Sequence, residues 1–450
     1  MTLLDQMFTA DNFRRIFDSE NRKGSNLGKR FFPSLEPHTK AIRDKKNEIK
    51  AHRSLIGTLT QQVFSAKLEA LRTELKVLKS AKSQQITTEL ELVSLKARKP
   101  SYKIALTQKI GPKGKPVFCI DGSPETFFVI KQLQYNIRKI YGLKQSNRHE
   151  LASQLRNTVA TSFPLEVVRT DVSSFYESID RHRLLERLEE DQLLSSSSKK
   201  YIKQILSSYG NVTGTANGIP RGVGISAYLA EFYMRPIDRE IRAIRGIILY
   251  CRYVDDIAAI FARPHEGEVI SSYETAVATI ISNHGLSHNA QKTTSFTLGE
   301  TQQNEFEYLG YHFLLDHGQC HLQLSQSKIK KFENRINAAF DEYERQSSVN
   351  SRRAYRELVS RIKFLTGNTR LVNSKSTAVT GTYYNNPMVT DTSSFNVLDT
   401  LLKKRINAVK RPNLRKRLKK YKFGEGFLQR QFHNFSAQEF QRIVRAWKHV

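Results

Sequence analysis

The feature that most constrains the fold of this chain is a pair of adjacent aspartates inside an apolar stretch. Asp255 and Asp256 lie in the segment IILYCRYVDDIAAIF, residues 247–261, which predicts a strand, a tight turn and a second strand. Two neighbouring carboxylates repel each other and lose hydration in such surroundings unless a cation compensates them. A single aspartate at a turn is common, but this pair predicts a cation site at the end of a strand hairpin.

A third carboxylate follows another apolar strand. The segment LEVVRTD, residues 165–171, predicts a buried strand that ends at Asp171. Phosphoryl transfer from a nucleoside triphosphate uses two divalent cations roughly 3.5–4 Å apart, and Mg²⁺ prefers carboxylate oxygens. A carboxylate at one strand end, facing a turn that presents two more, is suited to that chemistry.

The charge of the chain indicates a polyanionic partner. The 72 Lys and Arg residues outnumber the 43 Asp and Glu residues and give a net charge of +29, which favours nucleic acid over a merely solubilising surface. Three cysteines, Cys119, Cys251 and Cys320, form no disulfide framework and favour a reducing cytoplasm. No apolar run is long enough to predict a membrane span, so we expect no membrane partner.

Three regions follow from the texture of the sequence. Residues 1–99 predict a helical N-terminal extension, because residues 38–98 are rich in helix formers and contain a single glycine. Within them Ile42, Ile49, Ile56 and Val63 recur every seven residues, which is typical of a helical hairpin or coiled-coil-like arm. This arm packs either on its own domain or on a partner, and an oligomer formed through it is one expectation.

Residues 100–320 alternate predicted strands and helices and therefore indicate an α+β domain with an antiparallel sheet. Its first part, residues 102–120, predicts a strand hairpin with a basic tip. Residues 321–450 predict a basic helical region in which aromatic residues alternate with Lys and Arg. That pattern suits an RNA backbone with unstacked bases and is also compatible with a helix bundle that has a charged surface.

At this point a family resemblance is visible. YVDD (253–256) resembles the signature of reverse transcriptases. Four further motifs of that family lie before and after it, in family order. These are TDVSSFYESID (170–180), NGIPRGVGISAYLAEFYM (217–234), NAQKTTSF (289–296) and FEYLGYHF (306–313), with a fingers-like segment at 113–137. The resemblance implies a right-hand polymerase with fingers, a palm sheet and a helical thumb. It implies an RNA-directed DNA polymerase that adds dNTPs to a DNA product.

The resemblance also implies the roles of the carboxylates. Asp171, Asp255 and the backbone carbonyl of Val172 would hold two Mg²⁺ ions, for which Mn²⁺ could substitute, and Asp256 would support them. Lys292 would protonate the leaving pyrophosphate. The alternative for a lone lysine is a solvated position without a catalytic role.

A second set of residues is implied to bind the nucleotide. Tyr176 falls where reverse transcriptases keep an aromatic under the sugar, which would exclude a ribose 2′-OH; the alternative is a core aromatic beside Phe175. Gly222 would let the backbone approach the nucleotide. Basic residues near the predicted hairpin could clamp the triphosphate, with Lys115 favoured where the family usually has an arginine. These are Lys103, Lys113 and Lys115.

Arg221 departs from the family pattern, which has Gln before the glycine that corresponds to Gly222. Arginine adds a permanent charge and a planar set of donors. It could stack on a base, grip a phosphate or bind guanine acceptors, and each option would narrow what the site accepts. The alternative is that Arg221 pairs with a local acid such as Glu231 or Asp238.

The opening FTADNFRRIFDSENRKG and the later segment RIKFLTGNTRLVNSKSTAVTGTYYNNP resemble bacterial defence-associated reverse transcriptases. The first enzyme of the two-enzyme type 3 systems is the nearest likeness. This implies antiviral defence, a noncoding RNA as template or scaffold, and a second reverse transcriptase as partner. Three alternatives stay open: an inert RNA-binding scaffold, an RNA-dependent RNA polymerase, and a template-independent or protein-primed DNA polymerase of the abortive-infection kind.

Overall fold

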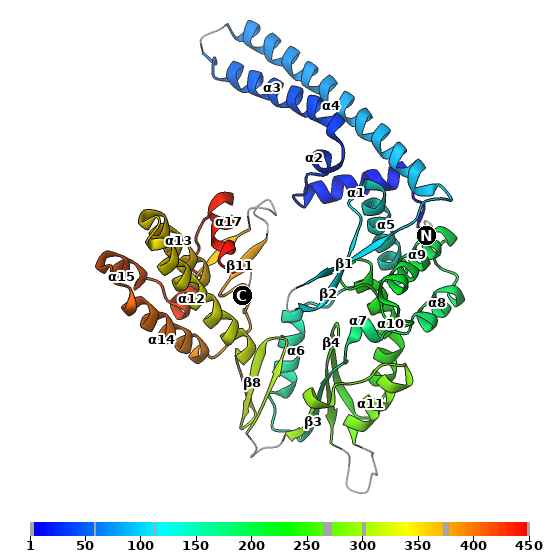
Figure 1. Ribbon diagram of the computed structural model, residues 1–450, viewed down its shortest axis with the longest axis vertical. Coiled ribbons are helices and arrows are strands. Elements are labelled where there is room, and N and C mark those ends of the chain that lie inside the picture. Colours follow the sequence, from blue (N-terminus) through cyan, green and yellow to red (C-terminus); the bar gives the residue numbers. More distant parts are fainter. Residues whose placement is uncertain are drawn as a thin grey trace. The chain divides into compact units, whose positions relative to one another are not determined.

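The structure is a computed structural model that describes residues 4–57, 60–111, 114–263, 272–298, 303–371 and 378–447. The chain divides into two compact units, which Figure 1 shows as a ribbon. The first unit comprises residues 1–144 and 176–233, and the second comprises residues 145–175 and 234–450. The three regions predicted from the sequence stay a prediction beside these two units. No helix within the described ranges combines the length and the apolar content needed to cross a membrane.

The first unit begins with four α-helices. Asn26 accepts a hydrogen bond from the backbone of Lys29 and so caps the second of them. Phe13 and Phe17 on the first helix are buried, and Phe13 packs on Phe128 with the ring centroids 5.3 Å apart. The helices are α1 (Ala10–Arg22), α2 (Leu27–Phe31), α3 (Glu36–Arg53) and α4 (Gln61–Arg98).

The predicted helical arm is present as a hairpin of α3 and α4 (Figure 1). Lys45 of α3 bonds Glu74 of α4 at 2.7 Å, and the two helices pack along their length. The predicted seven-residue seam is wrong as a continuous feature, because the helix breaks between Arg53 and Gln61. Ile56 lies in that break and is 74% exposed, whereas Ile49 is buried. The seven-residue spacing continues through the connection between the two helices, and periodicity alone does not reveal that connection.

The rest of the first unit packs helices around the predicted hairpin. Strands β1 (Leu106–Ile110) and β2 (Pro116–Ile120) pair antiparallel, as predicted. Ser123 caps α5 by accepting from the backbone of Thr126, and Gly214 ends α9 in the left-handed conformation. The helices are α5 (Pro124–Ile140), α7 (Phe175–Ser178, which begins at the end of the second unit), α8 (Arg181–Glu190), α9 (Ser196–Thr213) and α10 (Ser226–Arg242, which continues into the second unit).

The second unit contains the antiparallel sheet that the sequence predicts. Its strands are β3 (Leu165–Asp171), β4 (Ile247–Tyr253), β5 (Asp256–Ala262) and β6 (Thr294–Leu298), in the order β4-β5-β3-β6. Strands β3 and β5 are central, and every side chain from Ile257 to Phe261 is fully buried. This continuous apolar run fits a strand covered on both faces. Helix α11 (Tyr273–Asn283) contacts β3.

A second sheet of three strands follows, formed by β7 (Asn304–Tyr308), β8 (Tyr311–Asp316) and β9 (Gln319–Leu324). The sequence predicts the first pair and misses β9. Helix α6 (Arg148–Val159) contacts both β4 and β9 and so joins the two sheets of this unit. The α+β fold with an antiparallel sheet is therefore confirmed.

The C-terminal region is helical, as predicted, and encloses an aromatic core. Phe423 is fully buried, and Phe427 and Trp447 are nearly so. Of the two interpretations of this pattern, packing within a helix bundle therefore applies to these three aromatics, which do not face nucleic acid. The elements are α12 (Gln326–Ser347), α13 (Ser351–Thr366), β10 (Asn368–Arg370), β11 (Val379–Gly381), α14 (Ser393–Ala408), α15 (Pro412–Leu418), α16 (Phe423–Leu428) and α17 (Ala437–Arg445).

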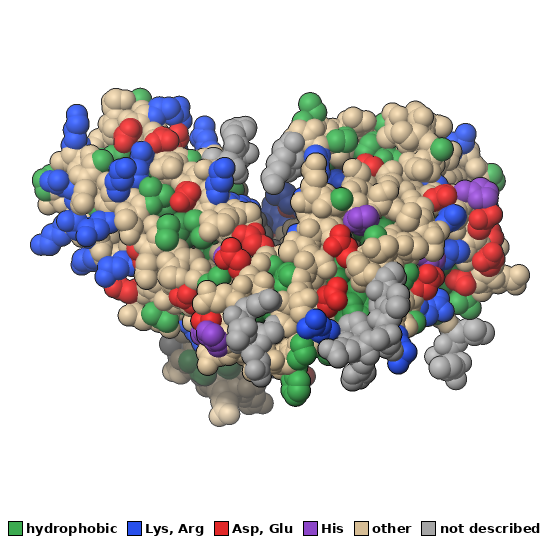
Figure 2. All heavy atoms as spheres, turned by 90° about the horizontal axis from the view of Figure 1, so that it is seen from below, with side chains coloured by type: hydrophobic (Ala, Val, Ile, Leu, Met, Phe, Trp, Pro, Cys, Tyr) green, Lys and Arg blue, Asp and Glu red, His purple; other side chains and the backbone are tan. Residues whose placement is uncertain are grey.

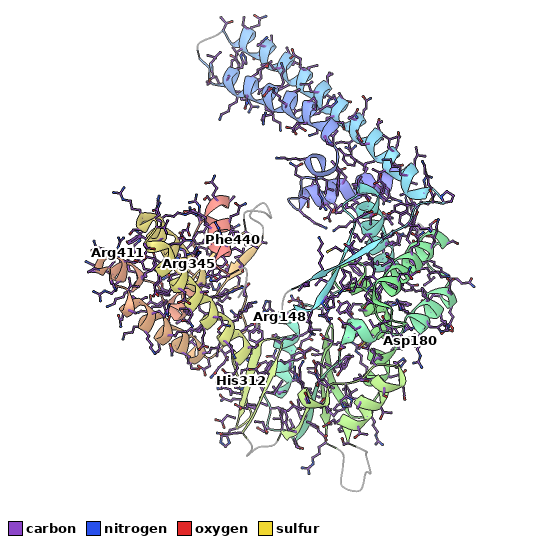
Figure 3. The ribbon with its side chains drawn as sticks, viewed as in Figure 1. Arg148, Asp180, His312, Arg345, Arg411 and Phe440 are labelled. Atoms are coloured by element: carbon purple, nitrogen blue, oxygen red, sulfur yellow. The ribbon has the colours of Figure 1, made fainter. Side chains whose placement is uncertain are left out.

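Lys and Arg side chains gather on the outside of these helices. Figure 2 shows them over the C-terminal region, on the left in that view, and Figure 3 labels Arg345 and Arg411 among its side chains. Lys416, Arg417 and Lys419 are exposed, while Leu414 and Leu418 of the same helix are buried. Helix α15 is therefore amphipathic, with its apolar side in the core and its basic side at the surface.

Candidate active site

Two of the predicted carboxylates lie opposite each other across neighbouring strands of the second unit. Asp171 ends β3, Asp256 begins β5, and the two are direct partners in the antiparallel register. The backbone N–H of Val172 donates to the carbonyl of Asp255 at 3.1 Å, so the third aspartate is held beside the same strand end. The structure therefore brings Asp171, Val172, Asp255 and Asp256 together at one end of the two central strands.

The turn that presents the aspartate pair has an unusual backbone. Val254 has a φ of 61°, a conformation that β-branched residues rarely adopt. Arg252 donates to the carbonyl of Val254 at 2.9 Å and forms an ion pair with Asp238 at 2.7 Å. Tyr308 donates to the carbonyl of Asp256 at 3.3 Å from a buried position. The surrounding side chains thus hold the turn in a conformation that it would not adopt alone.

Two cations pair with the carboxylates. Arg169 donates to Asp256 Oδ1 at 3.0 Å and to the carbonyl of Lys292 at 3.0 Å. Lys292 Nζ lies 2.7 Å from Asp171 Oδ2. Burial raises the pKa of Asp256, Arg169 opposes that rise, and Asp255 and Asp171 add to it. Lys292 therefore lies beside the carboxylates as predicted, and its catalytic role stays a prediction.

The donor set fits a divalent cation in kind. Asp171 is 8% exposed, and its Oδ1 is a buried atom that has no hydrogen-bond partner among the described residues. A buried acceptor of this kind is suited to a cation. Across the described ranges no group of three or more His, Cys, Asp or Glu side chains is arranged as a metal site. The two Mg²⁺ ions therefore stay a prediction.

The first unit holds the predicted nucleotide-binding residues around a Gly-rich loop. Arg221 pairs with Glu177 at 2.9 Å, and its guanidinium lies over the ring of Tyr176, 5.6 Å from the centroid. The backbone N–H of Ile219 donates to the carbonyl of Tyr176 at 2.8 Å. Arg221 thus pairs with a local acid, although the partner is Glu177 and not Glu231 or Asp238. Its partner and Tyr176 are neighbours in one motif.

Gly222 is needed for packing in this unit. Its φ is 99°, and an added Cβ would lie 2.4 Å from Val117 Cγ1 and 2.8 Å from the carbonyl oxygen of Phe118. The glycine therefore lets the loop approach β2, and its approach to a nucleotide stays a prediction. Lys103 and Lys115 are exposed side chains of the same unit, and Lys113 lies outside the described residues.

Three supporting residues escaped the sequence analysis. Arg169 lies two residues before Asp171, so strand alternation places both on one face and could have revealed it. Arg252 and Glu177 could not be found in this way, because their partners come from distant parts of the sequence or from a loop. These residues fix the geometry of the predicted ones.

One family model matches the part of the chain that carries these residues. Residues 125–313 match the family model described as reverse transcriptase (RNA-dependent DNA polymerase). No curated protein matches the chain. The matched residues contain all three aspartates, Tyr176, Arg221, Gly222 and Lys292, whereas the N-terminal helices and the C-terminal bundle lie outside them.

Similar solved structures are polymerases of low sequence identity. The truncated apo telomerase of Candida Tropicalis is 15% identical over 49% of this chain and 54% of that chain, with a TM-score of 0.33. A second apo telomerase structure from Candida Tropicalis is 12% identical over 77% and 62%, with a TM-score of 0.38. The RNA-dependent RNA polymerase of a human picorbirnavirus is 14% identical over 77% and 64%, with a TM-score of 0.30.

The chain thus spans between 54% and 64% of the length of these three structures. The family match, rather than these distant likenesses, identifies the domain. It covers the sheet with its aspartate pair and the Gly-rich loop, and it confirms the sequence-based prediction of a nucleotidyltransferase at the level of the domain. Residues 125–313 of this chain are therefore similar to the reverse transcriptase domain of RNA-directed DNA polymerases.

Proposed function

We propose that this chain extends a primer with dNTPs on an RNA template, using Asp171, Asp255 and Asp256 as its catalytic carboxylates. The observation that carries the proposal is the strand register, in which Asp171 lies opposite Asp256 at one end of the central strands. Negative charge concentrated at one strand end is suited to hold divalent cations, which would stabilise the attacking and leaving oxygens of phosphoryl transfer. The reverse transcriptase domain supplies the reaction class.

Two basic residues of the second unit pair with the carboxylates. Arg169 favours the ionised form of Asp256 against the effect of burial. Lys292 Nζ lies 2.7 Å from Asp171 Oδ2, and we propose that Lys292 donates a proton to the leaving pyrophosphate. In the first unit, we propose that Tyr176 excludes the ribose 2′-OH and that Arg221 narrows the choice of base.

The test is the double variant Asp255→Ala with Asp256→Ala, assayed for dNTP incorporation on a primed RNA. Loss of the carboxylates should lower the rate by at least about 10²–10³-fold, as removal of one charge-stabilising group does in other enzymes. The chain offers a matched control, Glu190→Ala with Asp191→Ala, an adjacent and exposed acid pair at the end of α8. Normal incorporation by a folded Asp255/Asp256 variant would refute the proposal.

We propose that the basic surface of the C-terminal region binds RNA. Neutralising Arg415, Lys416, Arg417, Lys419 and Lys420 should weaken RNA binding and flatten the slope of log affinity against log salt. The expected change is about 0.7–0.9 per lost phosphate contact. The control removes five exposed lysines from the helical arm, namely Lys46, Lys50, Lys67, Lys76 and Lys79. An equal change in both variants would mean that only total charge matters.

We further propose a role in antiviral defence in the bacterial cytoplasm, with a noncoding RNA, a second reverse transcriptase and self-association through the α3–α4 arm. The support is the resemblance of the opening and late segments to bacterial defence-associated enzymes. Exposed apolar residues on the arm, among them Val63 and Val77, offer a surface for association. Phage plating on cells with and without the active chain tests the role, with the Asp255/Asp256 variant as the inactive reference.

A further inference from the structure

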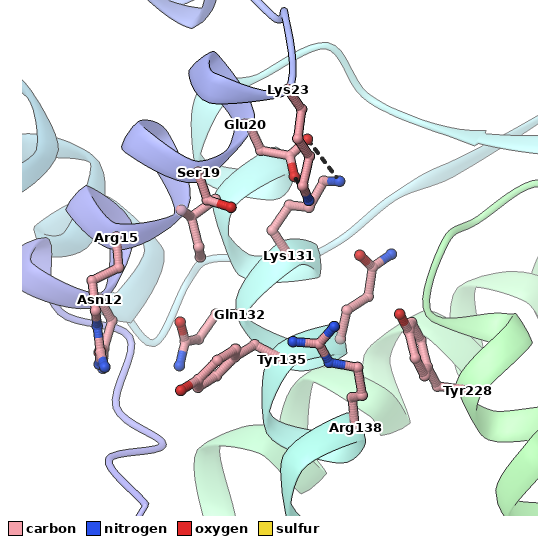
Figure 4. A pocket seen from close by; sticks show the side chains of 12 residues that line it. Asn12, Arg15, Ser19, Glu20, Lys23, Lys131, Gln132, Tyr135, Arg138 and Tyr228 are labelled. Atoms are coloured by element: carbon pink, nitrogen blue, oxygen red, sulfur yellow. Dashed lines mark hydrogen bonds and ion pairs between the residues drawn. The ribbon is translucent and has the colours of Figure 1, made fainter. Parts of the chain in front are cut away.

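A cavity of about 300 Å³ lies within the first unit, between α1 and α5. Figure 4 shows the side chains of the two helices facing each other across it, with Tyr228 of α10 at one side. Its volume is at the lower end of the range for small-molecule pockets. Half of its lining residues come from α1 and its C-cap Lys23, which lie outside the residues that match the reverse transcriptase family. The residues proposed for polymerisation do not line it.

The wall contains a buried acceptor without a donor. Asn12 is 1% exposed, and its Nδ2 donates to Asp5 Oδ2 at 3.0 Å and to the carbonyl of Met7 at 2.6 Å. Because both neighbours are acceptors, the orientation of the amide is fixed. Its Oδ1 has no hydrogen-bond partner among the described residues. Because this oxygen is fully buried, it does not contact an occupant of the cavity, and Asn12 instead ties α1 to the segment before it.

The wall is also strongly basic. It carries Arg15, Lys23, Lys131 and Arg138 against the single acid Glu20. Glu20 is already held by Lys23 at 2.8 Å and by Lys131 at 3.1 Å. Arg138 has no ion-pair partner in the described part of the chain and points into the cavity (Figure 4). An occupant with a phosphate would supply the missing negative charge.

Finally, the wall offers a flat surface. Tyr135 lies on α5, and the Arg15 guanidinium is 5.9 Å from its ring centroid. A nucleobase stacks on such aromatic and guanidinium planes. From the basic wall and this surface, we infer that the cavity binds one nucleotide. The base lies against Tyr135, and the phosphate contacts Arg138.

The cavity also touches the Gly-rich loop. Gln134 lines it, and an added Cβ at Gly224 would lie 2.0 Å from Gln134 Nε2. An occupant therefore contacts a side chain that packs directly on the loop that carries Arg221. A nucleotide of this kind can be free or can be an unpaired nucleotide of an RNA strand, and both present the same chemistry.

The experiment measures binding rather than polymerisation. The full chain carries Asp255→Ala with Asp256→Ala, and EDTA is present, so that nucleotide binding by the proposed cation site is suppressed. The probes are AMP, UMP and a single-stranded six-nucleotide RNA. The cavity variant is Tyr135→Ala with Arg138→Gln, and the control is Lys139→Gln, which alters an exposed residue of α5 outside the cavity. Circular dichroism verifies that each variant is folded.

We expect the cavity variant to bind at least one probe about 10-fold or more weakly, since one base stack alone contributes about 1–3 kcal/mol, while Lys139→Gln binds as the parent does. Weaker binding of AMP or UMP identifies a free nucleotide, and an effect on the RNA alone identifies an unpaired RNA nucleotide. Arg138→Gln alone, a change at an exposed residue, should weaken phosphate-bearing probes but not adenosine. Unchanged affinity for all probes, or an equal loss in Lys139→Gln, would overturn the inference.

Discussion

The two units hold their pairs of charged residues in different ways. In the second unit, the backbone register fixes Asp171 opposite Asp256, and the strands around them are buried. In the first unit, Arg221 and Glu177 meet through partly exposed side chains, 32% and 38% exposed, above a Gly-rich loop. A partly exposed pair of this kind contributes little to stability. Arg221 can therefore exchange Glu177 for another partner at a small cost in stability. The aspartates, in contrast, cannot move unless the strand pairing is lost.

This difference suggests a division of labour that single substitutions can test. Changes at the sheet edge should abolish the reaction, and changes at the loop should alter which nucleotide is used. Changes in the buried core of the second unit, away from the aspartates and the basic surface, should alter stability alone.

The largest effect in the first unit is expected at Tyr176. The Tyr176→Ala variant should raise the use of rNTPs relative to dNTPs by about 10–200-fold, which is the usual range when a pocket loses or gains a small group. Competition between dNTPs and rNTPs on one primed template measures this ratio. Phe175→Leu, which alters the buried neighbour, is the control. If the Tyr176 variant keeps the parental preference, Tyr176 does not select the sugar.

A smaller effect is expected at Arg221. Arg221→Gln should broaden the use of the four dNTPs by a few-fold, because a permanent charge near the nucleotide is removed. Glu177→Gln separates two explanations, since it releases Arg221 without removing its charge. Incorporation of each dNTP on varied templates provides the measurement. Equal and template-faithful use of all four by both the parent and Arg221→Gln would show that Arg221 only pairs with Glu177.

The second unit contains a half-buried lysine that is far in sequence from the aspartate pair. Lys328 of α12 donates to Asn386 Oδ1 at 2.6 Å, and its Nζ lies 4.4 Å from the ring centroid of Tyr311. No ion pair with an acid is present among the described residues. Burial lowers the pKa of Lys328 to about 7, and the nearby Arg148 acts in the same direction.

The smallest effect on the reaction is expected at this lysine, where pH and stability are coupled. Between pH 7 and about 10, the unfolded chain binds a proton at Lys328 that the folded chain does not, so this group makes folding more favourable as pH rises. Lys328→Met should therefore flatten the dependence of unfolding free energy on pH in that window and leave dNTP choice unchanged. Urea unfolding at several pH values provides the measurement, with Lys330→Met, an exposed neighbour, as control. An unchanged slope would place the Lys328 amine in contact with water.

Much of the fold followed from local patterns. The apolar runs ending at Asp171 and flanking Asp255 predicted β3, β4 and β5, because a buried strand is recognisable from the apolar residues of its own sequence. Strand β9 was missed, since QCHLQL mixes polar and apolar residues in a short segment. Ile56 was misassigned, because a regular spacing persists through a turn.

The candidate site was predictable where a motif carries it and not where partners are distant. The aspartates, Tyr176 and Arg221 stand in contiguous motifs. Glu177 as the partner of Arg221 depends on how the loop folds back, which no local pattern specifies. The C-terminal aromatics show the same limit, because Phe423 and Trp447 alternate with basic residues whether they face RNA or a core. Composition records which side chains are available, and packing decides which way they face.

The contact between Gly222 and β2 restricts how this sequence can vary. Because an added Cβ at position 222 would meet the side chain of Val117, the two positions cannot change independently. The backbone N–H of Phe118 also donates to the carbonyl of Arg221 at 2.7 Å, which fixes the loop to the strand. A larger residue at 222 would need a smaller residue at 117, a shift of the Phe118 carbonyl and tolerance of its left-handed backbone. Among relatives of this chain, we therefore expect the sizes of the residues at positions 117 and 222 to covary.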